Sequence, residues 1–168
     1  MAEIRVEPLP NGALLEHYRQ SGAYTDCFVI DVDGEFAHPE FVRAFYTSWL
    51  FKIERFILTW VVNKPSNDKE AAALAEDKAE SFAAWTVEGR TSDQLLMCDY
   101  QSRTRSWLMT ALLEGGKRTR LYFGSAVVPL RPDGQKDRAF GMTFDLLVGF
   151  HKFYARALLR AAVGNLRP

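Results

Sequence analysis

The last long apolar stretch of the chain, residues 144–162, constrains the fold most strongly. Its apolar residues recur at helical spacing, at Phe144, Leu147, Val148, Tyr154, Leu158, Ala161 and Ala162. Lys152, Arg156 and Arg160 share the opposite face at intervals of four. Such an amphipathic helix needs a broad apolar partner surface, and we expect the strands before it to supply one.

Length and composition indicate one folded domain, residues 1–168. The 168 residues are 48% apolar, with 12 Phe, 6 Tyr and 4 Trp, which is ample for a core. The chain has 2 Cys, Cys27 and Cys98, and we expect both to be buried free thiols rather than a disulfide. We find no secretory signal and no run that could span a membrane. We therefore expect a soluble, cytoplasmic protein without an integral membrane span.

The formal net charge is zero, but the charges are unevenly placed. Residues 1–100 carry 9 Lys and Arg against 17 Asp and Glu, and residues 101–168 carry 12 against 4. Either the two halves pack together and neutralise each other, or a basic face binds an anionic ligand or nucleic acid. No ribonucleoprotein motif, helix-turn-helix signature or zinc-finger spacing is present, so we expect no nucleic-acid partner.

The pattern of residues predicts helices and strands in separate blocks. A strand is expected over residues 24–32, followed by one or two helices over residues 39–62, with Pro39 at the first helical position. Asn67 with Glu70 predicts a capped helix that runs to about Ala84. Further strands are expected at residues 85–89, 94–99, 104–113 and 118–128, followed by a loop over residues 129–138.

The pair Gly115-Gly116 predicts the firmest hairpin, because glycine takes positive φ without strain. The hairpin sets Leu113 opposite Arg118, Ala111 opposite Arg120 and Met109 opposite Tyr122. Side chains alternate along a strand, so this register sorts them into two faces. The uncharged face, which we expect to meet the terminal helix, collects Leu108, Thr110, Leu112, Leu121, Phe123, Ser125 and Val127. The other face collects Arg105, Trp107, Met109, Arg118, Arg120 and Tyr122.

The predicted fold class is α+β, a curved antiparallel sheet that grips a long C-terminal helix, with helices inserted after the first strand. Residues 118–129 (RTRLYFGSAVVP) and the helix core GFHKFYARALL resemble a bacterial branch, of unknown function, of the START-like helix-grip superfamily (polyketide cyclases and lipid-transfer proteins). The resemblance covers mainly residues 85–162. It implies a cavity between sheet and helix for an apolar or amphipathic ligand, and further strands for which the sequence shows no clear counterpart.

The sequence offers little catalytic chemistry. No His, Asp or Glu set has metal-ligand spacing, neither Cys has a CxxC partner, and no nucleophile elbow or phosphate loop is present, so no metal or cofactor is expected. His38, before Pro39, is interpreted as a helix-capping residue. His151 lies on or beside the apolar stripe of the terminal helix, either as a core-edge histidine or as a ligand contact.

The arginines Arg103, Arg105, Arg118 and Arg120 lie on neighbouring predicted strands and need compensation. Acidic residues such as Asp26, Asp31 or Asp99 are one source, and an anionic head group or a partner subunit is the other.

The favoured function is a module that binds an apolar or amphipathic small molecule. Its predicted ligand-binding residues are His151, Leu108, Thr110, Leu121, Phe123, Leu147, Arg103, Arg105 and Arg120. The alternatives are a structural or dimerising protein with a filled core, which leaves a homodimer open, and, less favoured, an enzyme that uses His151.

Overall fold

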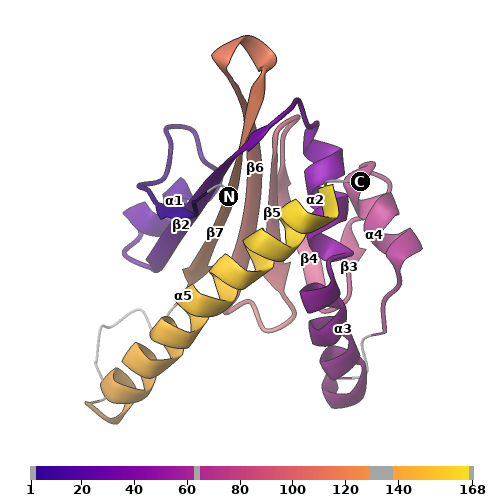
Figure 1. The fold of residues 1–168 in the computed structure, drawn as a ribbon. Coiled ribbons are helices and arrows are strands. Elements are labelled where there is room, and N and C mark those ends of the chain that lie inside the picture. The colour runs from indigo at the N-terminus through magenta and orange to yellow at the C-terminus, as the bar shows by residue number, and fades with distance from the viewer. Residues whose placement is uncertain (1–2, 63–64, 129–137, 167–168) are drawn as a thin grey trace.

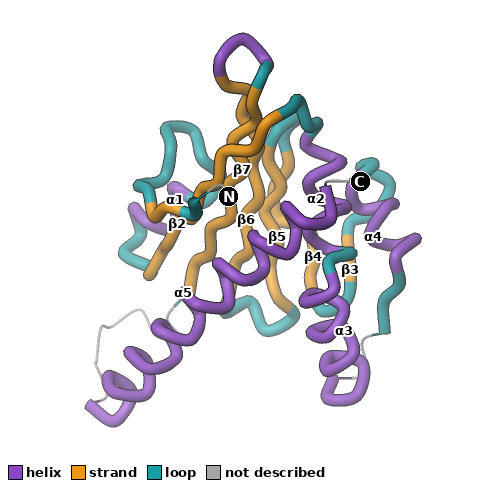
Figure 2. The backbone as a smooth tube through the Cα atoms, in the orientation of Figure 1, coloured by secondary structure: helices purple, strands orange, loops and turns teal. Residues whose placement is uncertain are grey.

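The computed structural model describes residues 3–62, 65–128 and 138–166, as helices and strands of one mixed α+β fold (Figures 1 and 2). The helices are α1 (Glu16–Gln20), α2 (His38–Tyr46), α3 (Trp49–Val62), α4 (Asp68–Ala75) and α5 (Arg138–Leu166). The strands are β1 (Arg5–Val6), β2 (Tyr24–Asp33), β3 (Ser81–Phe82), β4 (Trp85–Arg90), β5 (Gln94–Asp99), β6 (Thr104–Leu113) and β7 (Arg118–Val127).

The described strands form one seven-stranded antiparallel sheet in the order β1-β2-β7-β6-β5-β4-β3. The helices α2, α3 and α4 are inserted between β2 and β3, and α5 follows β7. In Figure 1, α5 runs diagonally across one face of the curved sheet and ends beside α2. The predicted α+β fold with a helix-grip arrangement is therefore confirmed.

The β6–β7 hairpin has the predicted register. Leu113 pairs with Arg118, Ala111 with Arg120 and Met109 with Tyr122. Gly115 and Gly116 take φ values of 65° and 88°, the left-handed region that glycine adopts without steric cost. The same alternation continues into β2, because Phe28 pairs with Phe123 and Ile30 with Leu121. Each central strand therefore has an inner face toward α5 and an outer face away from it.

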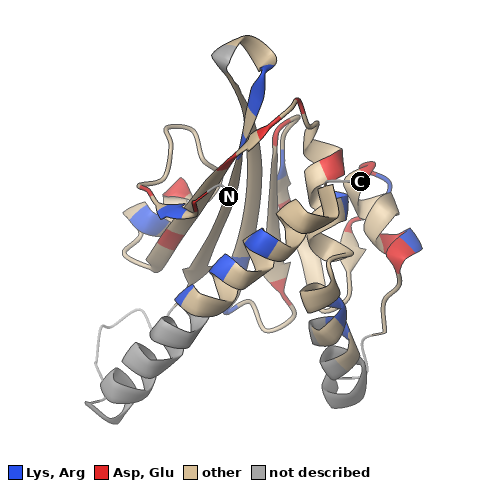
Figure 3. Ribbon diagram, viewed as in Figure 1, with Lys and Arg blue, Asp and Glu red and all other residues tan. Residues whose placement is uncertain are grey.

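The inner face forms the larger of two cores. Leu108, Leu121 and Phe123 pack in one buried cluster with apolar residues of α5, namely Ala155, Leu158, Leu159 and Ala162. Aromatic side chains of α2, α3 and β3 fill the same cluster, namely Phe41, Phe45, Tyr46, Phe51 and Phe82. The face predicted to meet the terminal helix does so, and Lys152, Arg156 and Arg160 are exposed, which agrees with the blue segments along α5 in Figure 3.

The outer face carries a second, smaller core. Trp107 and Tyr122 are buried there with residues of the N-terminal segment and of β2 and β5, namely Ala13, Leu15, Cys27, Val29 and Leu96. The buried amide of Gln94 fastens this segment to the sheet. Its Oε1 accepts from Trp107 Nε1 and from the N–H of Leu14, each at 2.9 Å, and its Nε2 donates to the Gly12 carbonyl at 3.1 Å. One side chain thereby pairs with three polar groups, those of Gly12, Leu14 and Trp107.

Both cysteines are free and buried, as expected. Cys27 and Cys98 lie in β2 and β5, strands that are not neighbours in the sheet. Burial, with smaller contributions from Asp26 and Glu7, raises the pKa of the Cys27 thiol to about 12. Within the described part of the chain, none of the helices combines the length and the apolar character needed to cross a bilayer.

The helix that begins after Asn67 is shorter than predicted. The capping box is present, since Asn67 Oδ1 accepts from the N–H of Lys69 and Glu70 at 3.0 Å and Glu70 accepts from the N–H of Asn67 at 2.9 Å. However, α4 ends at Ala75, not near Ala84. Asp77 takes a positive φ of 59°, which interrupts the helix.

The residues beyond α4 enter the sheet, where Phe82 in β3 pairs with Trp85 and is buried in the inner core. The short strands β1 and β3 were not predicted. The stretch predicted as one or two helices is two, since α2 ends at Tyr46 and α3 begins at Trp49. The terminal helix α5 extends beyond the predicted residues at both ends. The predicted 129–138 loop lies outside the described residues except for Arg138, which begins α5.

Gly124 lies in β7, where the neighbouring strands β2 and β6 leave no room for a side chain. A Cβ there would lie 2.8 Å from the Asp26 carbonyl oxygen, 2.9 Å from the Trp107 ring and 3.1 Å from Leu15. We expect Gly124→Ala to lower the free energy of unfolding by about 1–3 kcal/mol, because backbone and a buried indole must move. Gly164→Ala, in α5 with open space around it, should raise it by about 0.5–1 kcal/mol. Urea unfolding of both variants measures this, and equal effects would contradict it.

Candidate functional site

Those predicted ligand-binding residues that lie on strands divide between the two faces of the sheet, with Leu108, Thr110, Leu121 and Phe123 on the inner face and Arg105 and Arg120 on the outer face. Leu108, Leu121 and Phe123 are all buried in the inner core, and the Phe123 ring centroid lies 4.9 Å from that of Phe45. Side chains of α2 and α5 therefore occupy the space next to these three residues. Leu147 and His151 belong to α5, but their side chains lie outside the described residues.

Arg105 and Arg120 lie on the outer face of the sheet, which points away from α5. Carboxylates neutralise both of them there. Arg120 donates to both oxygens of Asp31, at 2.6 and 2.9 Å, and Arg5 donates to the same carboxylate at 3.0 Å. These hydrogen bonds hold the pKa of Asp31 below its usual value, and the bond from Arg120 has the largest effect. Arg105 donates to Glu88 at 2.8 Å and stacks over the Tyr18 ring, 4.8 Å from its centroid.

The other two arginines also contact carboxylates, Arg118 through its side chain and Arg103 through its backbone. Arg118 lies 3.4 Å from Asp33, and the backbone N–H of Arg103 donates to the Asp99 carboxylate at 2.7 Å. Carboxylates of the acidic first half thus neutralise Arg105, Arg118 and Arg120 of the basic second half. This is the first of the two explanations for the uneven charge.

Three buried polar residues form a row across the inner face of β2, β7 and β6. Asp26 lies opposite Ser125, and Ser125 lies opposite Ser106. One oxygen of Asp26 accepts from the Ser125 N–H at 3.0 Å and from its hydroxyl at 2.6 Å, and the other accepts from Tyr24 at 3.3 Å. Burial, with a smaller contribution from Asp26, raises the pKa of Tyr24 to about 12. The row binds β2 to β7 through charge-assisted hydrogen bonds.

A groove of about 470 Å³ lies at the upper rim of the sheet, where α2 begins. It lies beside a step in the sheet, because β5 pairs with β6 only as far as Gln94 and Met109, whereas β6 and β7 stay paired to Leu113 and Arg118. Figure 1 shows the hairpin rising above the neighbouring strands. The groove, called the rim groove below, is lined by Glu35, Phe36, Ala37, His38, Pro39, Ser92, Asp93, Thr110, Ala111 and Leu112. Thr110 is the one predicted ligand-binding residue in this lining.

His38 is the unusual residue of the rim groove. It begins α2 and is only 9% exposed, and both of its ring nitrogens are buried without a hydrogen-bond partner. The prediction that His38 caps the helix is wrong, because the N-cap is Ala37 and its N–H donates to Glu40 at 2.7 Å. Burial lowers the pKa of His38 to about 4, against smaller opposing effects of Asp93 and Asp77. The imidazole is therefore neutral at pH 7, with one donor and one acceptor.

The chain before α2 holds His38 in place. The Phe36 N–H donates to the Thr119 hydroxyl at 3.0 Å, and that hydroxyl donates to the Gly34 carbonyl at 2.7 Å. Thr119 is fully buried in β7, so the segment that carries His38 is fixed to the central strands. The pair His38-Pro39 was the one sequence signal for this site, and it shows only where the helix begins.

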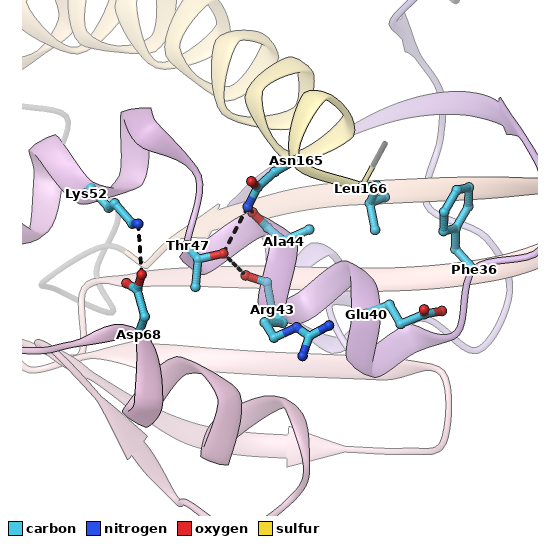
Figure 4. A pocket seen from close by; sticks show the side chains of 9 residues that line it. All are labelled: Phe36, Glu40, Arg43, Ala44, Thr47, Lys52, Asp68, Asn165 and Leu166. Atoms are coloured by element: carbon cyan, nitrogen blue, oxygen red, sulfur yellow. Dashed lines mark hydrogen bonds and ion pairs between the residues drawn. The ribbon is translucent and has the colours of Figure 1, made fainter. Parts of the chain in front are cut away.

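A second groove of about 380 Å³ lies between α2 and the C-terminal end of α5 (Figure 4). Its walls are joined by polar contacts. Asn165 donates to the Ala44 carbonyl at 3.1 Å and to the Thr47 hydroxyl at 2.9 Å, and Lys52 lies 2.8 Å from Asp68. These contacts fasten α5 to α2 and α3 to α4, so we assign this groove a structural role. Among the described residues, no cluster of His, Cys, Asp and Glu could hold a metal ion.

Comparisons with known proteins give no family assignment. No family model matches the chain, and no curated protein matches it. Among solved structures, the chain is similar to the crystal structure of CalU16 from Micromonospora echinospora, with 11% sequence identity and a TM-score of 0.33. The match covers 99% of this chain and 92% of that one. The identity and the TM-score are too low for this likeness to indicate a shared ligand or activity.

The buried histidine should make stability depend on pH. Between pH 6.5 and 4 the unfolded chain binds a proton at His38 that the folded protein does not bind. The free energy of unfolding therefore falls as pH falls through this window, by up to about 3 kcal/mol from this residue. His38→Leu removes that loss, so its stability relative to the parent should rise steadily from pH 7 to pH 4. Urea unfolding at a series of pH values tests this, and a difference that is constant with pH would contradict it.

Proposed function

We propose that this protein binds a small amphipathic molecule in the rim groove. The ligand places a hydrogen-bonding group at His38 and Thr110 and its apolar body along Phe36 and Leu112. This keeps the ligand class predicted from the sequence and moves the site from beneath α5 to the start of α2. The filled packing around Leu108, Leu121 and Phe123 supports the move.

The observation that carries the proposal is the unpaired imidazole of His38. Folded proteins pair nearly all buried polar groups, and each one left unpaired costs about 1–3 kcal/mol. A histidine that bears this cost on the wall of a groove has two hydrogen bonds to offer a ligand. Both nitrogens are closed off from solvent, so the ring or a neighbouring side chain turns when a ligand enters.

The shape and lining of the rim groove agree with small-molecule binding. Its volume of about 470 Å³ lies within the usual range of ligand sites, about 300–1,000 Å³. Leu112 is 55% exposed, a large apolar side chain that a ligand could cover. Such sites combine apolar walls with a few polar groups, and here the polar groups are the imidazole of His38 and the hydroxyls of Thr110 and Ser92.

Octanol is a neutral probe for this site. Titrated into isotope-labelled protein, it should give saturable NMR shift changes at the amides of Ala37, Ser92 and Thr110. Ser92→Trp places an indole at the rim of the groove and should abolish binding. Gln101→Trp, a matched change at an exposed turn position in the β5–β6 connection, should leave it intact. His38→Leu should weaken binding about tenfold, through loss of the hydrogen bond.

Two results would overturn the proposal. One is the absence of saturable octanol binding up to its solubility limit. The other is saturable binding that maps outside the rim groove and that Ser92→Trp leaves unchanged. Native mass spectrometry of the purified protein then identifies the class of any molecule that remains bound.

A dimerising role is the second candidate, and one surface favours it. Trp49, Ile53 and Phe56 follow one another along α3 at intervals of four and three, and they are 65%, 49% and 65% exposed. An apolar helical stripe of this kind is typical of an interface. If two copies pair through it, sedimentation velocity should show a concentration-dependent dimer that Trp49→Ser abolishes and Phe153→Ser, on exposed α5 surface, does not. A monomer at all concentrations would exclude this role.

A further inference from the structure

We propose that the rim groove selects a ligand whose polar end is a protonated amine. The inference rests on the proposed function and names the chemical class of its ligand: an ammonium head group on an apolar body. Three properties of the groove carry it: its charged residues are both acidic, no ion pair with a described cation neutralises them, and the neutral imidazole of His38 lies in the same lining.

The charged residues that line the rim groove are both acidic. Glu35 is exposed just before the start of α2, and Asp93 is half-buried in the turn that leads into β5. Asp93 accepts a hydrogen bond from the Thr91 hydroxyl at 2.7 Å, which positions its carboxylate without neutralising it. Neither Glu35 nor Asp93 forms an ion pair with a described residue. The second groove, by contrast, has Arg43 and Lys52 beside Glu40 and Asp68.

Arg90, the described cation that acts on His38, already forms an ion pair with another residue. Arg90 opposes the effect of Asp93 and Asp77 on the imidazole. Its guanidinium forms an ion pair with Asp77 and donates to the carbonyls of Leu74 and Ala79 at 2.9 and 3.0 Å. These contacts hold Arg90 at the C-terminal end of α4, where its ion pair is with Asp77 and not with Asp93. The groove therefore presents uncompensated negative charge to a ligand.

His38 completes the recognition of an amine. Its neutral imidazole accepts a hydrogen bond from an ammonium N–H, while the carboxylates of Asp93 and Glu35 balance the positive charge. A carboxylate or phosphate head group would meet two like charges and no described cation on the groove wall. An alcohol could pair with the imidazole but would gain nothing from the carboxylates. The geometry thus ranks the ammonium first, the alcohol second and the anion last.

Three probes with the same apolar chain test this ranking: octylammonium, octanol and octanoate. We expect octylammonium to bind about tenfold more tightly than octanol at low salt, from two partly exposed charge pairs. Octanoate should bind more weakly than octanol. The preference for octylammonium over octanol should shrink at high salt, because exposed charge pairs are screened.

Isosteric variants locate the source of the preference. Asp93→Asn and Glu35→Gln keep the shape and one accepting oxygen of each side chain but remove the charge, and each should reduce the octylammonium preference about threefold while leaving octanol affinity unchanged. Glu80→Gln, an exposed position near β3 outside the groove lining, changes the net charge equally and should have no effect.

The outcomes separate the two proposals. If octanol binds in the rim groove but octylammonium binds no more tightly, the amine inference fails and the proposed function stands. If none of the three probes binds there, the proposed function itself fails. If octylammonium is preferred but Asp93→Asn and Glu35→Gln leave the preference intact, the charge assignment is wrong.

Discussion

The antiparallel pairing of β6 with β7 is the constraint on which the other features depend. Its register assigns every residue of the two strands to one face, and β2 inherits the same alternation by pairing with β7. The inner face can then receive α2 and α5, and the outer face can receive α1. A slip of one residue in β7 would move Leu121 from the inner core to the outer face and turn Arg120 toward α5. The groove at the rim exists because this hairpin outruns β5.

The features that could be predicted from the sequence are those fixed by local chemistry. Gly115-Gly116 determines a turn, Asn67 with Glu70 determines a helix start, and the apolar stripe of residues 144–162 determines a helix that needs a sheet. The end of α4 could not be predicted, because an alanine-rich stretch stays helical by propensity until Asp77 and the burial of Phe82 override it. The strands β1 and β3 have two residues each and form only because a neighbouring strand is present.

The candidate site was hidden in the sequence for a related reason. The burial of His38 arises from the packing of α2 against the sheet, which no window around residue 38 reveals. The apolar ligand contacts predicted from the sequence lie on the uncharged face, where α2 and α5 cover Leu108, Leu121 and Phe123. The predicted arginines were correctly sorted to the other face, and the sequence also named Asp31 as a source of compensation for them. The scaffold can be predicted where local sequence preferences agree with the fold. A functional site is found where a residue departs from those preferences.

The insertion of three helices between β2 and the rest of the sheet has a consequence for how the chain folds. Tyr24 at the start of β2 pairs with Val127 at the end of β7, so β2 has no partner on that side until β7 has been synthesised. During synthesis the hairpins of β4 to β7 can close first, each between neighbours in sequence, while the edge of β2 stays open. Pairing β2 with β7 closes a long loop, and local contacts do not offset the entropic cost of closing it. Sheets with such long-range strand pairs fold slowly. Docking of β2 and then of α5 is therefore expected to be the late step that completes both cores at once.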